Sequence, residues 1–155
     1  MNRKPIALLM AGTSSAAIAA LHVVIVFLGA PAYRYFGAPR ELVRLAEARS
    51  LVPAAITFGL ALLFCLFAAY AFAAAGAIPR LPLMRTALAG ISIIYLLRGV
   101  SAVPQGIALA LRPGLVRPRD FVFSAVAMIV GVAYALGTRA VWSGLRYNRR
   151  QPAAQ

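Results

Sequence analysis

The sequence predicts an all-α membrane protein: a four-transmembrane-helix bundle with a short interfacial helix in the first outer loop. Of the 155 residues, 63% are hydrophobic and 12% are charged, whereas soluble domains are about 45–50% apolar. Four apolar runs are each long enough to cross a hydrocarbon core of about 30 Å, which takes about 20 helical residues. We expect helices at 6–31, 51–78, 87–111 and 121–142, which form a single integral membrane domain over 1–155.

The first apolar run follows a basic start, Arg3 and Lys4, as in a signal peptide. Its apolar stretch continues for about 25 residues, whereas a cleavable signal has an apolar region of about 7–15. We therefore expect this segment to be retained as the first membrane helix.

The first loop contains an aromatic cluster and then an amphipathic segment. Tyr33, Tyr35 and Phe36 are typical of the aromatic belt at a membrane interface. From Pro39 onward, the apolar residues fall within about 160° of a helical wheel, which predicts a short interfacial helix, although Arg49 intrudes on this face. The apolar positions are Leu42, Val43, Leu45 and Ala46, and the opposite positions are Arg40, Arg44 and Glu47.

One residue is expected to bend the third predicted helix, and another to begin the fourth. Pro104 lacks an N–H group, so we expect a kink that frees the carbonyl of Val100. Asp120 precedes the fourth apolar run and is predicted to be its N-cap.

Small residues at four-residue spacing predict close helix packing. They are Gly12, Ala16 and Ala20 in the first helix and Ala127, Gly131 and Ala135 in the fourth.

The formal net charge of +13 comes from basic residues spread over all connections. The side of the two termini holds eight of them and the other side seven, together with all three carboxylates. We expect both termini in the cytoplasm. Arginines on both sides of a membrane do not form the single basic stripe of a nucleic-acid-binding protein, so no nucleic acid is expected. Membrane lipids, including anionic ones, are the expected partners.

The sequence lacks the residues that several kinds of chemistry require. Cys65 is the only cysteine, so no internal disulfide or dithiol centre is available. One cysteine, one histidine and three carboxylates do not make a metal-ligand cluster, and no cofactor is expected. Glu41, Glu47 and Asp120 all lie outside the predicted spans, which argues against a proton-coupled pump or small multidrug exporter.

Arg98 is the exception to this pattern, because it lies inside the third predicted span, near the bilayer midplane. A lipid-facing arginine there costs about 2.5–3.5 kcal/mol on translocon scales. Tyr95, Ser101 and Gln105 share its helix face within about 120°. The charge could be satisfied by neutral acceptors, by a loop glutamate folded inward or by an anionic ligand.

The other three helices each add a polar group to the outer half of the bundle: His22, Thr57 and Tyr134. Each also has a structural interpretation, since a buried tyrosine needs only one partner and a helical Thr or Ser can bond its own i−4 carbonyl. The candidate ligand-binding residues are Arg98, His22, Tyr95, Gln105, Tyr134, Thr57 and Ser101. For Arg98, structural and ligand-binding roles are equally open.

The segments "LHVVIVFLGAPAYRYFGA", "PAAITFGLALLF", "RLPLMR" and "IYLLRG" resemble a family of small bacterial four-helix integral membrane proteins. This resemblance implies no activity. Together with the arginine-rich loops, it predicts that the chain lies in the bacterial cytoplasmic (inner) membrane. At the level of architecture only, the chain is similar to DoxX-like proteins. In size and basicity it also resembles the MAPEG membrane glutathione transferases, whose Glu-Arg and Asn motif of helix 2 is missing here.

Two hypotheses follow. The preferred one is a non-enzymatic inner-membrane protein, either an accessory subunit or a binder of a lipid or other amphipath, with a polar pocket around Arg98 that opens toward the outer leaflet. The alternative is a small membrane enzyme acting on a lipophilic substrate. In it, Arg98 stabilises negative charge, His22 is the acid or base, and Tyr134 or Tyr95 donates a proton. The enzyme requires His22 within hydrogen-bond reach of a substrate beside Arg98. A homo-oligomer and a membrane-protein partner both stay open.

The topology can be tested with reporter fusions. Because the first basic pair and the C-terminal arginine cluster lie on one side, a C-terminal alkaline phosphatase fusion should be inactive and a C-terminal fluorescent-protein fusion bright. An active phosphatase fusion would reverse the predicted orientation.

Overall fold

The structure is a computed structural model that describes residues 6–112 and 114–145. Within these residues all regular elements are helices. Four helical segments are long and apolar enough to cross a membrane: Ile6–Leu28, Val52–Ala75, Met84–Leu111 and Pro118–Leu145. The prediction of an all-helical chain with four such segments is confirmed. The basic residues Arg3, Lys4, Arg146, Arg149 and Arg150, which support the predicted topology, lie outside the described residues.

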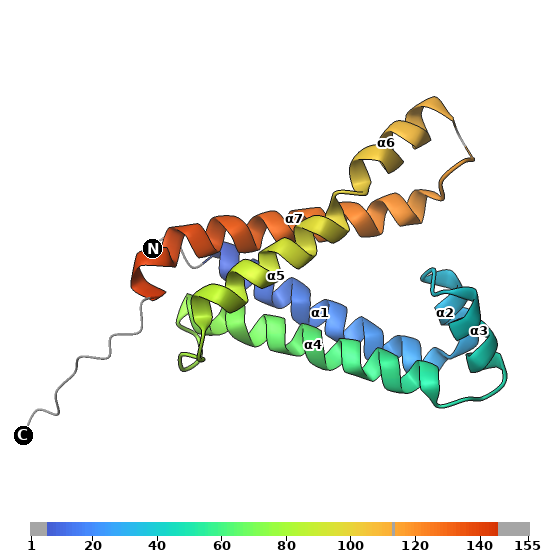
Figure 1. Cartoon of the computed structure of the whole chain (residues 1–155), viewed down its shortest axis with the longest axis horizontal. Coiled ribbons are helices and arrows are strands. Elements are labelled where there is room, and N and C mark those ends of the chain that lie inside the picture. The colour runs from blue at the N-terminus through green and yellow to red at the C-terminus, as the bar shows by residue number, and fades with distance from the viewer. Residues whose placement is uncertain (1–5, 113, 146–155) are drawn as a thin grey trace, which may run out of the picture.

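The long helices pack as two antiparallel pairs. Helix α1 (Ile6–Leu28) lies along α4 (Val52–Ala75), and α5 (Met84–Gly99) lies along α7 (Pro118–Val141). The two pairs meet chiefly where α1 contacts α7, while α4 and α5 touch less. Figure 1 shows that α1 begins and α7 ends at one end of the bundle, which we call the terminal end. The opposite end, which we call the loop end, carries α2, α3 and α6.

The buried core lies where the four long helices meet. Leu8, Leu88 and Tyr134 are completely buried there. A 3₁₀ turn, η1 (Trp142–Leu145), follows α7, and Arg85 of α5 donates a hydrogen bond of 2.5 Å to the Trp142 carbonyl. The outward faces are apolar as well: Leu62, Leu97, Ile129 and Leu136 are each more than half exposed. The described helices therefore carry apolar side chains both in the core and on their outward surface.

The first predicted helix is shorter than expected. It ends at Leu28 because Gly29 adopts a left-handed conformation (φ 69°), and a short helix α2 (Ala30–Tyr35) follows it. The predicted amphipathic helix is α3 (Arg40–Glu47), which packs against α2 and α4. Its apolar residues Leu42, Val43, Leu45 and Ala46 are half-buried, and Arg40, Arg44 and Glu47 are exposed.

Arg49 does not intrude on the apolar face of α3, because it lies beyond the helix end. It adopts a left-handed conformation (φ 56°), and the Ser50 N–H donates to the Leu45 carbonyl at 2.9 Å. This is the hydrogen-bond pattern of a Schellman motif, which ends the helix.

Two other helix ends differ from the prediction. Helix α4 ends at Ala75 rather than at residue 78, since Gly76 (φ 81°) starts the left-handed turn that closes it. Helix α7 begins at Pro118, three residues earlier than predicted, because a proline is favoured in the first turn of a helix. Asp120 is therefore not the N-cap. Arg117 holds that position, and Asp120 lies in the first turn.

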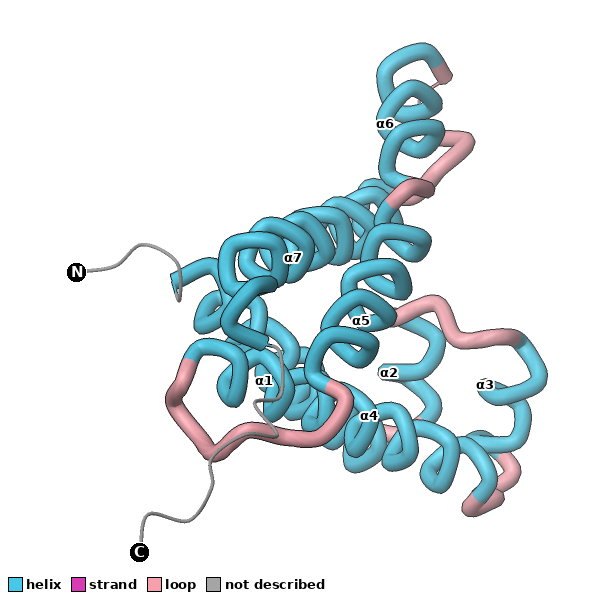
Figure 2. Tube along the Cα trace, turned by 60° about the vertical axis from the view of Figure 1, so that its left-hand side comes forward, coloured by secondary structure: helices cyan, strands magenta, loops and turns pink. Residues whose placement is uncertain are grey.

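The third predicted span is two helices rather than one kinked helix. Helix α5 ends at Gly99, the chain turns at 100–101, and α6 (Ala102–Leu111) leads away from α5 (Figure 2). The break comes before Pro104, whose ring excludes the normal helical bond to the Val100 carbonyl. That carbonyl instead accepts a hydrogen bond of 3.2 Å from the Val103 N–H. It was expected to be free for Arg98, and the structure corrects this.

Glycines allow α5 and α7 to approach closely. A Cβ atom at Gly99 would lie 2.5 Å from the backbone nitrogen of Met128, and one at Gly131 would lie 2.9 Å from that of Leu96. Among the predicted small-residue positions, Gly12, Ala127 and Gly131 are buried, Ala16 and Ala135 are half-buried, and Ala20 is exposed.

This packing predicts unequal effects for two glycine substitutions in α5. Gly99→Ala should lower the free energy of unfolding by about 1–3 kcal/mol, because the new methyl group must displace the Met128 backbone. Gly90→Ala is the matched control: nothing lies within 4 Å of its added Cβ. It should be neutral or stabilise by up to about 1 kcal/mol, since Ala favours helix. Unfolding in detergent measures both values, and equal effects would contradict the close packing.

Candidate functional site

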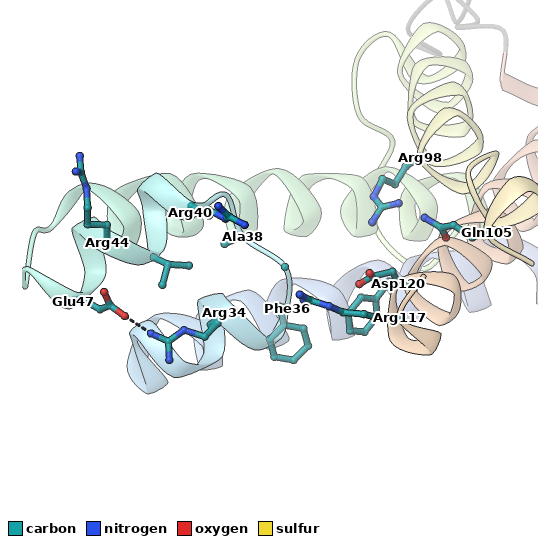
Figure 3. Close-up of a pocket in the computed structure, with 13 residues that line it drawn as sticks. Arg34, Phe36, Ala38, Arg40, Arg44, Glu47, Arg98, Gln105, Arg117 and Asp120 are labelled. Atoms are coloured by element: carbon teal, nitrogen blue, oxygen red, sulfur yellow. Dashed lines mark hydrogen bonds and ion pairs between the residues drawn. The ribbon is translucent and has the colours of Figure 1, made fainter. Parts of the chain in front are cut away.

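A cavity of about 810 Å³ opens at the loop end of the molecule. Its walls come from α2 and α3 on one side and from the ends of α5, α6 and α7 on the other (Figure 3). Five arginines and two carboxylates line it: Arg34, Arg40, Arg44, Arg98, Arg117, Glu47 and Asp120. We call this space the arginine cavity.

Aromatic contacts hold the two walls together. The ring of Phe36, just after α2, stacks on Phe123 of α7 with a centroid distance of 5.6 Å. Beside them, the guanidinium of Arg119 lies over the Tyr35 ring, 4.9 Å from its centroid. These contacts place the segment after α2 next to the start of α7, so the arginine cavity is built from parts far apart in sequence.

Arg98 lies in the last turn of α5, where the helix dipole favours a positive charge. Its Nη1 donates to the Ser124 Oγ of α7 at 2.9 Å, with a longer contact of 3.4 Å to the Ser101 Oγ. The two serine hydroxyls are 3.0 Å apart, and Ser124 can donate to the Asp120 carbonyl at 3.0 Å. Neutral serine hydroxyls therefore accept hydrogen bonds from one nitrogen of this guanidinium.

Within the described residues, the rest of the Arg98 guanidinium has no protein partner. A guanidinium carries five N–H donors, and among the described residues only its Nη1 makes hydrogen bonds. The side chain is exposed and lines the arginine cavity. The sequence predicted a charge in the middle of one kinked helix, but the structure places it at a helix end beside an opening.

The charges of the arginine cavity do not balance. Arg34 forms an ion pair with Glu47, and Arg44 pairs with Glu41 at 2.8 Å. The other three lining arginines, Arg40, Arg98 and Arg117, have no carboxylate within 4.0 Å in the part of the chain that the structure describes. With five arginines and two carboxylates, the lining carries a formal charge of +3.

Two hydrogen-bond acceptors also line the cavity. The Oε1 atom of Gln105 in α6 is buried and has no hydrogen-bond partner within residues 6–112 and 114–145. The Asp120 Oδ1 atom is 4.0 Å from the Arg119 Nε, at the outer limit of an ion pair. A buried acceptor without a hydrogen bond lowers the stability of the protein by about 1–3 kcal/mol. A ligand that donates hydrogen bonds to these groups would therefore gain binding free energy.

Tyr95 and Tyr134 lie elsewhere, in a closed polar centre within the core. The Ser15 Oγ is 2.9 Å from both tyrosine hydroxyls, and Tyr134 donates to the Phe67 carbonyl at 2.9 Å. The two rings stack with a centroid distance of 5.6 Å. Tyr95 and Arg98 were predicted to share one face, but Tyr95 points into the core and Arg98 into the arginine cavity.

His22 and Thr57 lie apart from both the arginine cavity and the closed polar centre. The His22 Nδ1 lies 2.7 Å from the Ile18 carbonyl, and its ring lies 5.0 Å from that of Phe64. Thr57 donates to the Pro53 carbonyl at 2.8 Å and accepts from the Tyr33 hydroxyl at 3.0 Å. Neither residue lines the arginine cavity.

Of the seven predicted site residues, only Arg98 and Gln105 line the arginine cavity, and Ser101 contacts Arg98 beside it. Tyr95 and Tyr134 meet each other in the core instead. Sequence reasoning missed Ser124 and Arg117, and it gave Asp120 a capping role only. The signal that could have identified Ser124 is its place on α7, one turn after Asp120, as a hydroxyl in an apolar run.

The closed polar centre around Tyr95 and Tyr134 predicts that loss of a tyrosine hydroxyl lowers the stability of the protein. Tyr134→Phe removes the hydroxyl that bonds Ser15 and the Phe67 carbonyl, and should lower the free energy of unfolding by about 1–2 kcal/mol. Tyr35→Phe is the control and should change little, since this exposed tyrosine makes no hydroxyl hydrogen bond to any of residues 6–112 and 114–145. Detergent unfolding curves test both. A Tyr134→Phe protein as stable as the Tyr35→Phe protein would show that the buried bonds contribute nothing.

None of the protein-family models, curated proteins or solved structures compared with this chain matches it. Its function therefore has to be inferred from the geometry and charge of the arginine cavity.

Proposed function

We propose that this chain is a multi-pass protein of the bacterial cytoplasmic membrane that binds an anionic amphipathic molecule, with the polar headgroup in the arginine cavity. The observation that carries this proposal is the cavity itself, in which three arginines have no carboxylate partner among the described residues. On this proposal the protein is a binder rather than an enzyme.

The outward surface of the helices supports membrane insertion. Leu62, Leu97 and Ile129 are each at least 68% exposed. In water, such surface costs about 25 cal/mol for each Å², and large continuous apolar patches are rare on soluble monomers. In a bilayer, the same side chains contact hydrocarbon at no cost. With both termini in the cytoplasm, as the arginine distribution predicts, the loop end and its cavity lie toward the outer leaflet.

The arginine chemistry supports an anionic headgroup. A planar guanidinium offers parallel N–H donors that match a phosphate or carboxylate group. Arg98 already uses Nη1 on Ser124, which fixes the orientation of its guanidinium and leaves its other donors for a ligand. A bound headgroup would have its apolar tail beside the exposed aliphatic side chains of α5 and α6, such as Leu97 and Ile107.

The enzyme hypothesis has less support. It requires His22 beside Arg98, but His22 bonds the Ile18 carbonyl and packs on Phe64 outside the arginine cavity. The hydroxyls of Tyr95 and Tyr134 are both engaged with Ser15. This geometry favours binding over catalysis. An accessory role beside another membrane protein, self-association and the resemblance to small bacterial four-helix proteins stay predictions from the sequence.

The proposal predicts that Arg98 dominates the affinity for an anionic amphipath. Arg98→Leu should weaken binding of dioleoyl phosphatidic acid by about 10- to 100-fold, since a hydrogen bond to a charged group contributes about 1.5–3 kcal/mol. Arg98→Lys should recover only part of this loss, because an ammonium lacks the planar fork. Native mass spectrometry or thermophoresis in a non-ionic detergent at fixed salt measures the Kd.

Arg112→Leu is the matched control, because Arg112 is exposed near the same end but does not line the arginine cavity. It should leave the Kd within about twofold of the wild-type value, as expected for a screened surface charge. An Arg98→Leu protein that melts normally and binds phosphatidic acid like wild type would contradict the proposed site.

A further inference from the structure

We propose that the arginine cavity selects a headgroup that carries both a single negative charge and free hydroxyl groups, as a phosphoglycerol headgroup does. Arg98 and Arg117 would hold the phosphate, and Gln105 and Asp120 would accept hydrogen bonds from the hydroxyls. This inference rests on the proposed binding function and names the chemistry of its ligand.

The first argument is the presence of a carboxylate among the arginines. Asp120 lines the same side of the cavity as Arg98 and Arg117 (Figure 3). Its contact with the Arg119 Nε is long, at 4.0 Å, and that Nε has no hydrogen-bond partner among the described residues. A ligand that was only an anion would be repelled by Asp120. A ligand whose hydroxyl faces Asp120 would instead donate a charge-assisted hydrogen bond to it.

The second argument is Gln105. Its Oε1 atom is buried and has no hydrogen-bond partner in the described part of the chain, and the residue lines the cavity beside Arg98. A terminal amide can rotate and present its oxygen or its nitrogen. Because arginines only donate, the amide oxygen and Asp120 supply the acceptors on this side of the cavity. The remaining lining carboxylate, Glu47, is already paired with Arg34 at the opposite side.

The third argument separates hydroxyl groups from an ammonium group, which could also donate to Asp120. The cavity lining carries a formal charge of +3. A zwitterionic headgroup leaves that charge uncompensated, and its ammonium would lie near Arg98 and Arg117. A headgroup with net charge −1 and neutral hydroxyls lowers the charge and still satisfies the acceptors. The volume of about 810 Å³ is ample for such a group, since small-molecule sites span roughly 300–1,000 Å³.

The test compares lipids that differ only in the headgroup. Dioleoyl phosphatidylglycerol and dioleoyl phosphatidylmethanol carry the same single charge, but only the first has free hydroxyls. Wild-type protein in one non-ionic detergent should bind phosphatidylglycerol about tenfold more tightly, because the second lipid leaves polar groups of the site unpaired. Dioleoyl phosphatidylethanolamine, a zwitterion, should bind more weakly than either.

Variants then identify the residues that cause the preference for phosphatidylglycerol over phosphatidylmethanol. Gln105→Leu and Asp120→Ala should each bring the ratio of the two Kd values close to one. They should keep the affinity for phosphatidylmethanol, and Asp120→Ala should raise it by removing a like charge. Glu47→Gln is the matched control: its carboxylate belongs to the ion pair with Arg34, so the ratio should stay at the wild-type value.

The outcomes are distinct. Equal wild-type binding of phosphatidylglycerol and phosphatidylmethanol would overturn the hydroxyl selectivity and leave the proposed anion binding in place. Preference for phosphatidylethanolamine would overturn it in favour of an ammonium group. Failure of all three lipids to bind, or binding that Arg98→Leu does not weaken, would overturn the proposed function itself. The lipid comparison on wild-type protein needs no variant to fold.

Discussion

The close contact between α5 and α7 at Gly99 is the constraint on which the loop end of the molecule depends. There is no room for a side chain at this position, because a Cβ atom would collide with the backbone of Met128. The contact brings the neighbouring Arg98 against α7, where Ser124 accepts its hydrogen bond. Pro104 cannot make the normal helical hydrogen bond, and after the turn at 100–101 α6 projects beyond the end of α5 (Figure 1). The opening between α6, α7 and the α2–α3 wall follows from this one crossing.

Two sets of polar groups in the described helices have opposite properties. Ser15, Tyr95 and Tyr134 form a closed centre in which each hydroxyl has a partner inside the protein. Such a satisfied network makes the core specific and leaves nothing for a ligand. The arginine cavity is the reverse, because Arg98 has spare donors and Gln105 has an unpaired acceptor. Unsatisfied groups beside an open space are what distinguishes a candidate binding site from a packed core.

The wall formed by α2 and α3 neutralises most of its own charge. Ion pairs join Arg34 to Glu47 and Arg44 to Glu41, all of which lie in α2 or α3. Both pairs are mainly solvent-exposed, and pairs of this kind contribute little to stability. Two contacts join this wall to α7: the stacking of Phe36 on Phe123 and the packing of Arg119 on the Tyr35 ring. Arg40 is the one lining arginine of this wall without a carboxylate partner among the described residues, and the other two such arginines, Arg98 and Arg117, lie on the opposite side.

The sequence by itself determined the helical architecture, since the length and hydropathy of each apolar run indicate a helix without knowledge of its neighbours. It also determined the amphipathic helix α3, because the periodicity of Leu42, Val43 and Leu45 is a local property. Helix ends were less predictable: at Gly76 and Pro118 local backbone preferences shifted them by three residues. Gly99 carried no recognisable signal, because its role depends on the backbone of another helix.

The composition of the site was decided by tertiary structure. Arg98, Ser101 and Gln105 could be selected because polar residues stand out in an apolar run, but a helical wheel places residues only around a single axis. Tyr95 and Arg98 share such a wheel, yet one is buried against Ser15 and the other borders the cavity, since α1 and α7 cover different parts of that face. Asp120 and Arg117 belong to the site because the first turn of α7 lies near α6 and the end of α5. The distance between groups on different helices depends on how the helices cross, and crossing is set by packing rather than by any local pattern.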